Sequence, residues 1–185
     1  MSDSLDSSGA PASGAWPRPE SGWPFWWRWV VATNLGWFPG IFIGLAAAEL
    51  APEPPTLVRA CVAALVAVTL FGGVQAWALR SFLPRPASWW LASIVGWTAG
   101  VALARLLIDA GSLALSSIVD AIAVGCIAGF VVGLTQTWVL TSTPSAPLAM
   151  GRAAWWPLIS ALGWGVLFPG AVPGVGLIWL ARSRR

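Results

Sequence analysis

The sequence predicts an all-α protein, a polytopic transmembrane helical bundle of about five spans built from parallel two-helix repeats. Three observations support this fold class: the scarcity of charge, long apolar segments, and two short phrases that recur at the segment ends. Of the 185 residues, 57% are hydrophobic and 9% are charged. Soluble domains carry about 25% charged residues, so this chain cannot cover a water-facing surface and we expect lipid to surround it.

Five apolar segments are long enough for a bilayer core, which needs about 20 residues of helix. The first ends at Glu49, before a proline-rich loop, and the second ends at Arg80. The fourth begins beside Asp120, where an acidic residue suits the positive end of the helix dipole. In chain order the segments run at about 29–48, 57–79, 89–108, 118–140 and 154–180.

The two ends of the chain differ from the transmembrane helical domain, which we place at residues 25–181. Residues 1–24 are mostly Ser, Gly, Pro and Ala, which cannot bury an apolar face, so we expect a disordered N-terminal tail. The aromatic residues around Trp26 suit the headgroup level and are interpreted as an interfacial anchor. Residues 182–185 form a basic C-terminal tail.

The last segment is interrupted by the pairs Pro169-Gly170 and Pro173-Gly174. It is therefore kinked or re-entrant at Pro169 and Pro173. A re-entrant segment is favoured by a weak echo of the second phrase, in which Leu177 stands where the other copies have Gln. A single kinked span is favoured by length, because each arm alone is too short to cross. We prefer the single span.

Two phrases define the repeat. Trp-x3-Thr/Ser-x2-Gly-Trp opens the odd segments, and Gly-x2-Gln-x-Trp-x-Leu closes the second and fourth. One unit is therefore a pair of helices about 60 residues long, from the offset between Gly36 and Gly96. Two crossings return the chain to its starting side, so successive units share one orientation. The first phrase begins at Trp29, Trp89 and Trp156, and the second at Gly72 and Gly133.

Both phrases place polar side chains at one depth, about four residues or ~6 Å inside the same membrane edge. A buried amide in lipid is costly without a partner, so we expect the glutamines to pair with the hydroxyl groups. This candidate polar layer consists of Gln75, Gln136, Thr33, Ser93 and Ser160. It is interpreted as a hydrogen-bonded packing layer, and the alternative is a vestibule for a solute or a lipid headgroup. Tryptophans are predicted to form an aromatic belt at the same edge: Trp29, Trp77, Trp89, Trp138 and Trp156.

Glycines recur every four residues on three of the predicted helices, which places them along one side of each helix. Such ridges of small residues let helix backbones approach closely where lipid supplies no hydrophobic drive. The predicted helix-packing residues are Gly36, Gly40 and Gly44, then Gly96 and Gly100, then Gly125, Gly129 and Gly133.

The charged residues predict an orientation. Loops on the side of the belt carry Arg28, Arg80, Arg85 and Arg152. Acidic residues such as Glu49 gather on the opposite side. Arginine in short loops marks the cytoplasmic side, so we expect a multi-pass protein of a bacterial cytoplasmic (inner) membrane with its N-terminus in the cytoplasm.

The composition argues against several function classes. There is no His, Lys or Tyr, and the two cysteines are interpreted as apolar packing residues. We therefore predict no metal site, no cofactor and no catalytic residue, because ligands and nucleophile–base pairs are lacking. The net charge of +3 is too small and too scattered to indicate nucleic acid as a partner.

The phrases together resemble small bacterial multi-pass membrane proteins of uncharacterised activity. The resemblance rests on Gln75-Ala-Trp-Ala-Leu-Arg80, on Trp89-Trp90-Leu-Ala-Ser93 and on Gly96-Trp97, and it covers residues from about 26 to 180. It implies an α-helical membrane fold and no particular reaction. The third unit departs from the pattern because it lacks the Gln and contains the Pro-Gly pairs.

From these features we expect a structural or accessory membrane component without enzymatic activity. Its partners would be the lipid bilayer and a second copy of the chain or another membrane protein, packed through the glycine ridges. The alternative is a small-solute or lipid transporter or channel that uses the polar layer near one leaflet.

Overall fold

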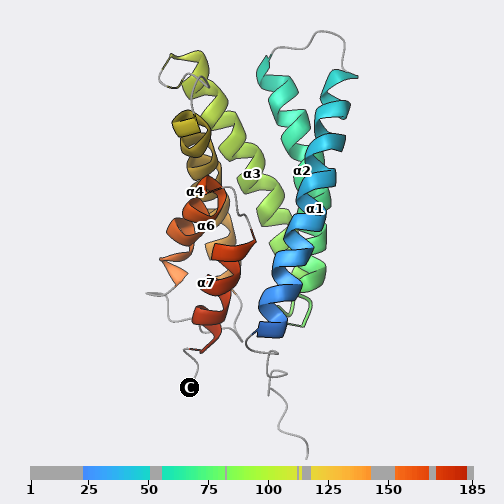
Figure 1. Ribbon diagram of the computed structural model, residues 1–185, viewed down its shortest axis with the longest axis vertical. Coiled ribbons are helices and arrows are strands. Elements are labelled where there is room, and N and C mark those ends of the chain that lie inside the picture. Colours follow the sequence, from blue (N-terminus) through green and yellow to red (C-terminus); the bar gives the residue numbers. More distant parts are fainter. Residues whose placement is uncertain are drawn as a thin grey trace, which may run out of the picture.

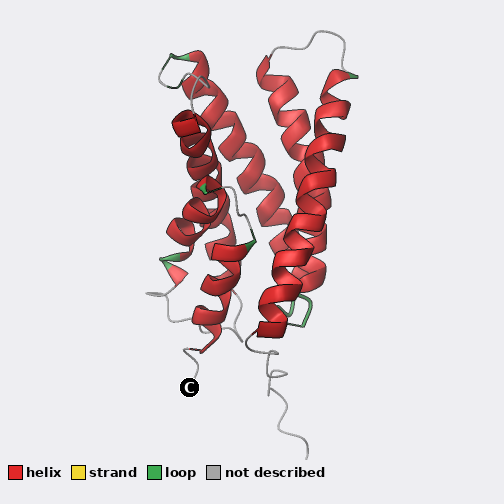
Figure 2. Cartoon of the chain, in the orientation of Figure 1, coloured by secondary structure: helices red, strands yellow, loops and turns green. Residues whose placement is uncertain are grey.

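The computed structural model describes residues 23–50, 56–81, 83–111, 113, 118–142, 153–166 and 170–182. Within these residues the regular elements are α-helices and there is no strand, as the all-α prediction requires (Figures 1 and 2). The helices are α1 (Trp23–Glu49), α2 (Thr56–Ala78), α3 (Pro86–Asp109), α4 (Ile118–Ser142), α6 (Trp156–Gly165) and α7 (Ala171–Arg182).

Helices α1 to α4 are long and apolar enough to cross a membrane. They contain 23 to 27 residues, a rise of about 35 to 40 Å at ~1.5 Å per residue. Their outward faces are apolar, with Phe42 71% exposed and Val95 61% exposed. The apolar side chains face outward and the polar side chains lie in the interior. This distribution suits a protein that is surrounded by lipid. The chain is therefore a multi-pass membrane protein with at least these four apolar helices.

Among the four long helices, the predicted and observed bounds differ most at the start of α1, which begins at Trp23 rather than near residue 29. The aromatic anchor around Trp26 is thus the first turn of the helix. Several sequence predictions fall outside the described residues, namely residues 1–22 of the tail, Arg152, Pro169 and residues 183–185.

Each long helix packs against the next one along the chain, α4 packs against α6, and α7 packs against both α6 and α1. The described helices therefore close a ring. Helices α1, α3 and α6 begin at one end of this ring, which is the lower end in Figure 1, and α2 and α4 finish there. We call it the belt end. The end of α1 and the start of α4 lie at the opposite end (Figure 1).

The last segment is two short helices that lie side by side. Helix α6 has 10 residues and α7 has 12, which at ~1.5 Å per residue is about 15 and 18 Å, half of a bilayer core. Gly163 lies beside Pro173, and Gly176 lies beside Ile159, so the two helices run in opposite directions. The end of α7 lies near the start of α1 (Figure 1). This arrangement contradicts the single kinked span that we preferred, because a single span would separate Gly176 from Ile159 by the length of the segment.

The glycine ridges are the seams along which neighbouring helices meet. A methyl group added to Gly36 would lie 2.6 Å from the Cα of Phe71 on α2. One added to Gly100 would lie 2.7 Å from the Cα of Ala128 on α4. The remaining ridge residues also face neighbouring backbones: Gly40 and Gly44 face α2, Gly96 faces α4, and Gly125, Gly129 and Gly133 face α6.

The packing partner of these ridges differs from the one expected. We expected the ridges to bind a second copy of the chain or another membrane protein. The structure places them against helices of the same chain, where no room is left for a side chain. Any protein partner would therefore have to use another surface.

Candidate functional site

The five polar side chains predicted to form one layer are all buried. They come from five different helices. Their burial is nearly complete because each lies on the side of its helix that faces the interior of the ring. Their exposed fractions are 0% for Thr33 and Ser93, 1% for Ser160, 3% for Gln75 and 5% for Gln136.

The two glutamines make equivalent hydrogen bonds in successive units. Gln75 Nε2 donates to Thr33 Oγ1 over 3.2 Å, and Gln136 Nε2 donates to Ser93 Oγ over 3.0 Å. Each bond joins the second helix of a unit to the first helix of the same unit. The hydroxyl of Ser93 in turn donates to the carbonyl oxygen of Trp89, one turn earlier on the same helix, over 2.8 Å.

Sequence reasoning missed the third partner in this network, the first tryptophan of the phrase. Trp89 Nε1 donates to Gln75 Oε1 over 3.4 Å, and Trp156 Nε1 donates to Gln136 Oε1 over 2.9 Å. These indoles and that of Trp29 are at most 1% exposed. Our prediction that they belong to an aromatic belt facing the membrane surface is therefore wrong. The signal was present, because Trp, Thr or Ser, and Gly at spacings of four and three share one helix face.

The remaining belt residues, Trp77 and Trp138, do lie on the outside. Trp77 is 53% exposed and Trp138 is 65% exposed. They follow the glutamines by two residues, a helical rotation of about 200°, which points them away from the ring. The second phrase thus supplies an interior amide and an exterior indole from one turn of helix.

The third unit lacks the glutamine, and the structure records the consequence. Leu177 on α7 is 1% exposed and belongs to the same buried cluster as Trp29 and Trp156. Trp29 Nε1 is buried and has no hydrogen-bond partner. An indole N–H removed from water without an acceptor is destabilising by roughly 1–3 kcal/mol.

The second tryptophan of each phrase forms another layer, one to two turns farther along the helices. The ring centroids of Trp37 and Trp97 lie 5.3 Å apart, those of Trp37 and Trp164 4.6 Å, and those of Trp97 and Trp164 4.4 Å. Phe71 packs against all three. Aromatic rings at such distances contribute packing energy beyond the area they bury. The interior is therefore filled by side chains at this level.

The layer has little capacity for chemistry. Its members are amides, hydroxyls and indoles, none of which is charged near neutral pH. In the part of the chain that the structure describes, no group of three or more His, Cys, Asp or Glu side chains could hold a metal ion. The arrangement is suited to holding helices together, since every hydrogen bond that the two glutamine side chains make joins two different helices.

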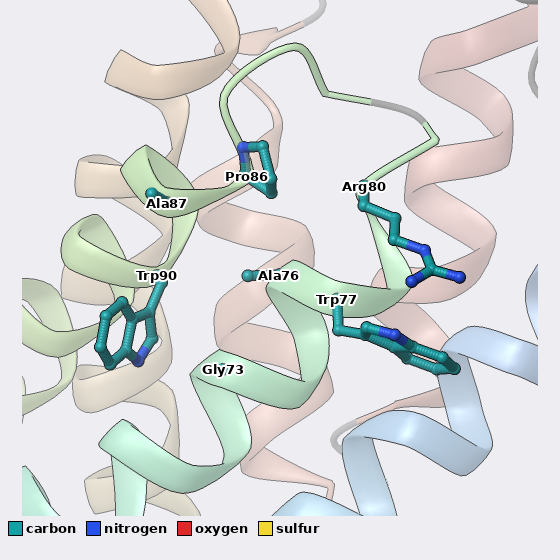
Figure 3. Close-up of a pocket in the computed structure, with 7 residues that line it drawn as sticks. All are labelled: Gly73, Ala76, Trp77, Arg80, Pro86, Ala87 and Trp90. Carbon is teal, nitrogen blue, oxygen red and sulfur yellow. The ribbon is translucent and has the colours of Figure 1, made fainter.

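A groove opens on the outer surface at the belt end, between the last turn of α2 and the first turn of α3. It has a volume of about 360 Å³. Figure 3 shows Trp77 and Arg80 on one side of it, Trp90 and Pro86 on the other, and Gly73 at its base. The lining is almost entirely apolar.

The walls of this groove are held in place by specific contacts. The guanidinium carbon of Arg80 lies 4.9 Å from the ring centroid of Trp77, a cation–π arrangement. Trp90 Nε1 donates to the carbonyl oxygen of Thr69 over 3.0 Å, which fixes the opposite indole. A methyl group added to Gly73 would meet only Trp90 Nε1, at 3.8 Å, so the base of the groove is open.

Charge is distributed unequally between the two ends of the ring. At the far end, Arg105 forms an ion pair with Asp109, and Arg59 lies 3.8 Å from a carboxylate oxygen of Glu49. The acidic residues within the described ranges all belong to helix ends at that far end: Glu49 ends α1, Asp109 ends α3, and Asp120 is in the first turn of α4. Arg80 and Arg85 at the belt end are both exposed. Within the described residues, the belt end is therefore positive and carries no carboxylate.

Comparison of the chain with protein-family models, with curated proteins and with solved structures finds no match.

Proposed function

We propose that this chain is a structural or accessory component of its membrane, without enzymatic activity, and that the polar layer holds the bundle together. The observation that carries the proposal is the pairing of Gln75 and Gln136. Each amide donates to a hydroxyl and accepts from an indole, all inside the ring. A site that binds a solute needs polar groups directed at a cavity, and these groups are directed at one another.

The positions of the grooves support this role over transport. The three grooves whose linings lie within the described helices are not lined by Gln75, Gln136 or the hydroxyl groups of the layer. The aromatic layer of Trp37, Trp97 and Trp164 lies next to the polar layer along the helices and fills the centre of the ring. A solute path along the ring axis would have to displace these rings.

We further propose a topology with the belt end in the cytoplasm of a bacterial cell and the N-terminus on that side. The unpaired positive charge of Arg80 and Arg85 supports this orientation, because arginine near short loops is retained inside. Four helices would cross the membrane, and α6 and α7 would form a re-entrant pair that enters and leaves at the belt end. Their antiparallel contact and short length support this version.

Flux measurements test the proposed role. The wild-type chain and the double variant Gln75→Leu, Gln136→Leu are reconstituted into liposomes, and osmotic swelling is followed with small neutral solutes and with monovalent salts. We expect both proteins to give the rate of protein-free liposomes, while the double variant unfolds more readily in detergent. A wild-type flux that disappears in a double variant with native helix content would replace the structural role by transport.

A reporter fused to the C-terminus tests the topology. Alkaline phosphatase is active only outside the cytoplasm. Green fluorescent protein fluoresces only in the cytoplasm, because it does not become fluorescent when it is exported through the general secretion route. We expect fluorescence without phosphatase activity for fusions after Arg185, and phosphatase activity for fusions after Glu49, which serves as the matched control. Phosphatase activity at both positions would exclude the re-entrant pair.

A further inference from the structure

We propose that the groove at the belt end, between the last turn of α2 and the first turn of α3, is a binding site for one anionic phospholipid. The acyl chain would lie on the apolar surface at the base of the groove, and the headgroup phosphate would lie against Arg80. This inference goes beyond the structural role, and it depends on that role only in placing the groove in contact with lipid.

The shape and lining of the groove suit an acyl chain. Its base is formed by Gly73 and Ala76 and one wall by Trp90, which is held by its hydrogen bond to Thr69. Gly73 has no side chain, and a Cβ added there would meet only the Trp90 indole within 4 Å outside its own helix backbone, so the space is open to the bilayer. An apolar groove on the outer face of a membrane bundle is filled by lipid tails in preference to water.

The position of Arg80 suits a phosphate. It follows the last turn of α2, beside Trp77, which is 53% exposed, at the depth where indoles mark the headgroup region. The cation–π contact with Trp77 holds the guanidinium against that indole at the edge of the groove, and Figure 3 shows both side chains extending away from Trp90. A planar guanidinium in a fixed place binds phosphate oxygens well.

The charge of the belt end favours an anionic lipid over a zwitterionic one. Arg85 directly precedes Pro86, which lines the groove, and it adds a second exposed cation. A choline or ethanolamine group would find no carboxylate partner here, because the described residues place their carboxylates at the far end. An additional negative charge on the headgroup would instead be attracted by both arginines.

The fold itself does not require an arginine at this position. The equivalent residue of the second unit, five positions after Gln136, is Thr141, whose hydroxyl donates to the carbonyl oxygen of Thr137 over 2.9 Å. The second unit thus places a neutral side chain at the equivalent position, inside α4, which continues to Ser142. Arg80 is therefore available for a role other than ending the helix.

Native mass spectrometry tests the site. The full chain is incorporated into nanodiscs that contain equal amounts of phosphatidylglycerol and phosphatidylcholine, extracted into mild detergent, and analysed for retained lipid. We expect one phosphatidylglycerol to be retained in preference to phosphatidylcholine. The variant Arg80→Gln should retain about fivefold less phosphatidylglycerol, the equivalent of about 1 kcal/mol for one arginine near the membrane surface.

Two further variants separate the groove from general charge. Gly73→Leu keeps both arginines but fills the groove, and it should reduce retention at least as much as Arg80→Gln. Arg59→Gln removes an arginine at the far end and should leave retention unchanged. The site would be refuted if Arg80→Gln retained as much phosphatidylglycerol as the wild type. It would also be refuted if Arg59→Gln lost as much, or if phosphatidylcholine were retained equally. A flux through the polar layer would overturn the structural role and leave these retention results unaffected.

Discussion

Replacing Gln136 with Leu tests whether the polar layer stabilises the bundle. Leu has nearly the volume of Gln, so the substitution removes the amide without leaving a large cavity. It deletes the donor to Ser93 Oγ at 3.0 Å and the acceptor of Trp156 Nε1 at 2.9 Å. Ser93 keeps its own bond to the carbonyl oxygen of Trp89, so the newly unpaired group is the Trp156 indole N–H.

The expected magnitude follows from these contacts. Interhelical hydrogen bonds in membrane proteins contribute about 0.6 kcal/mol each on average, which gives about 1.2 kcal/mol for the two bonds of Gln136. The buried indole N–H left without an acceptor adds about 1 kcal/mol. We expect the free energy of unfolding to fall by about 2 kcal/mol. For Gln75→Leu we expect about 1 kcal/mol, because its bonds of 3.2 and 3.4 Å lie at or beyond the usual range for N–H donors.

Equilibrium unfolding in mixed detergent micelles, followed by near-UV circular dichroism, gives these free energies. Gln136→Met is the matched control, since Met also fills the space and cannot replace the amide, so it should lose as much stability as Leu. The reasoning is refuted if Gln136→Leu is as stable as the wild type, or if Gln75→Leu loses more than Gln136→Leu.

Three other substitutions probe separate features by the same unfolding measurement. Leu177→Gln offers an acceptor to the unpaired indole N–H of Trp29, and we expect a gain of about 0.6 kcal/mol; an unchanged or lower stability would mean that the amide cannot reach it. Gly40→Leu brings a side chain against the backbone of α2, since a Cβ there would lie 2.9 Å from a carbonyl oxygen, and we expect a loss of about 1–3 kcal/mol. Its control, Gly73→Ala, enters open space and should stay within about 0.5 kcal/mol of the wild type. Trp97→Ala empties the centre of the aromatic layer and should lose about 3–5 kcal/mol; a loss below that of Gln75→Leu would show that the layer is not a packed core.

Much of the helical architecture follows from sequence because lipid imposes simple conditions on a chain. The apolar length of each segment predicts a helix, since every backbone polar group must be satisfied within it. The predicted limits of 57–79, 89–108 and 118–140 lie within a few residues of α2, α3 and α4. The expectation that Gln75 and Gln136 seek hydroxyl partners rests on the cost of an unpaired amide, which is independent of the tertiary arrangement.

Other features depend on which helices become neighbours. Trp89 and Trp156 have the composition of belt residues, yet both are buried, because a glutamine from the preceding helix accepts the indole N–H. The glycine ridge on α4 faces α6, whereas the ridge on α1 faces α2. A ridge of glycines in the sequence predicts that the backbone of another helix approaches closely, but it does not identify which helix that is.

The sequence by itself determined two features. Apolar length predicts long helices that cross a lipid bilayer. The spacing of Trp, of Ser or Thr, and of Gly places these residues on one side of a helix in each repeat. Only the tertiary structure decided that this face points into a ring and that the final segment folds back on itself. The physical reason is that both outcomes depend on contacts between residues distant in the chain. The indole of Trp156 finds its acceptor on α4, and Gly163 and Gly176 let α6 and α7 pack side by side.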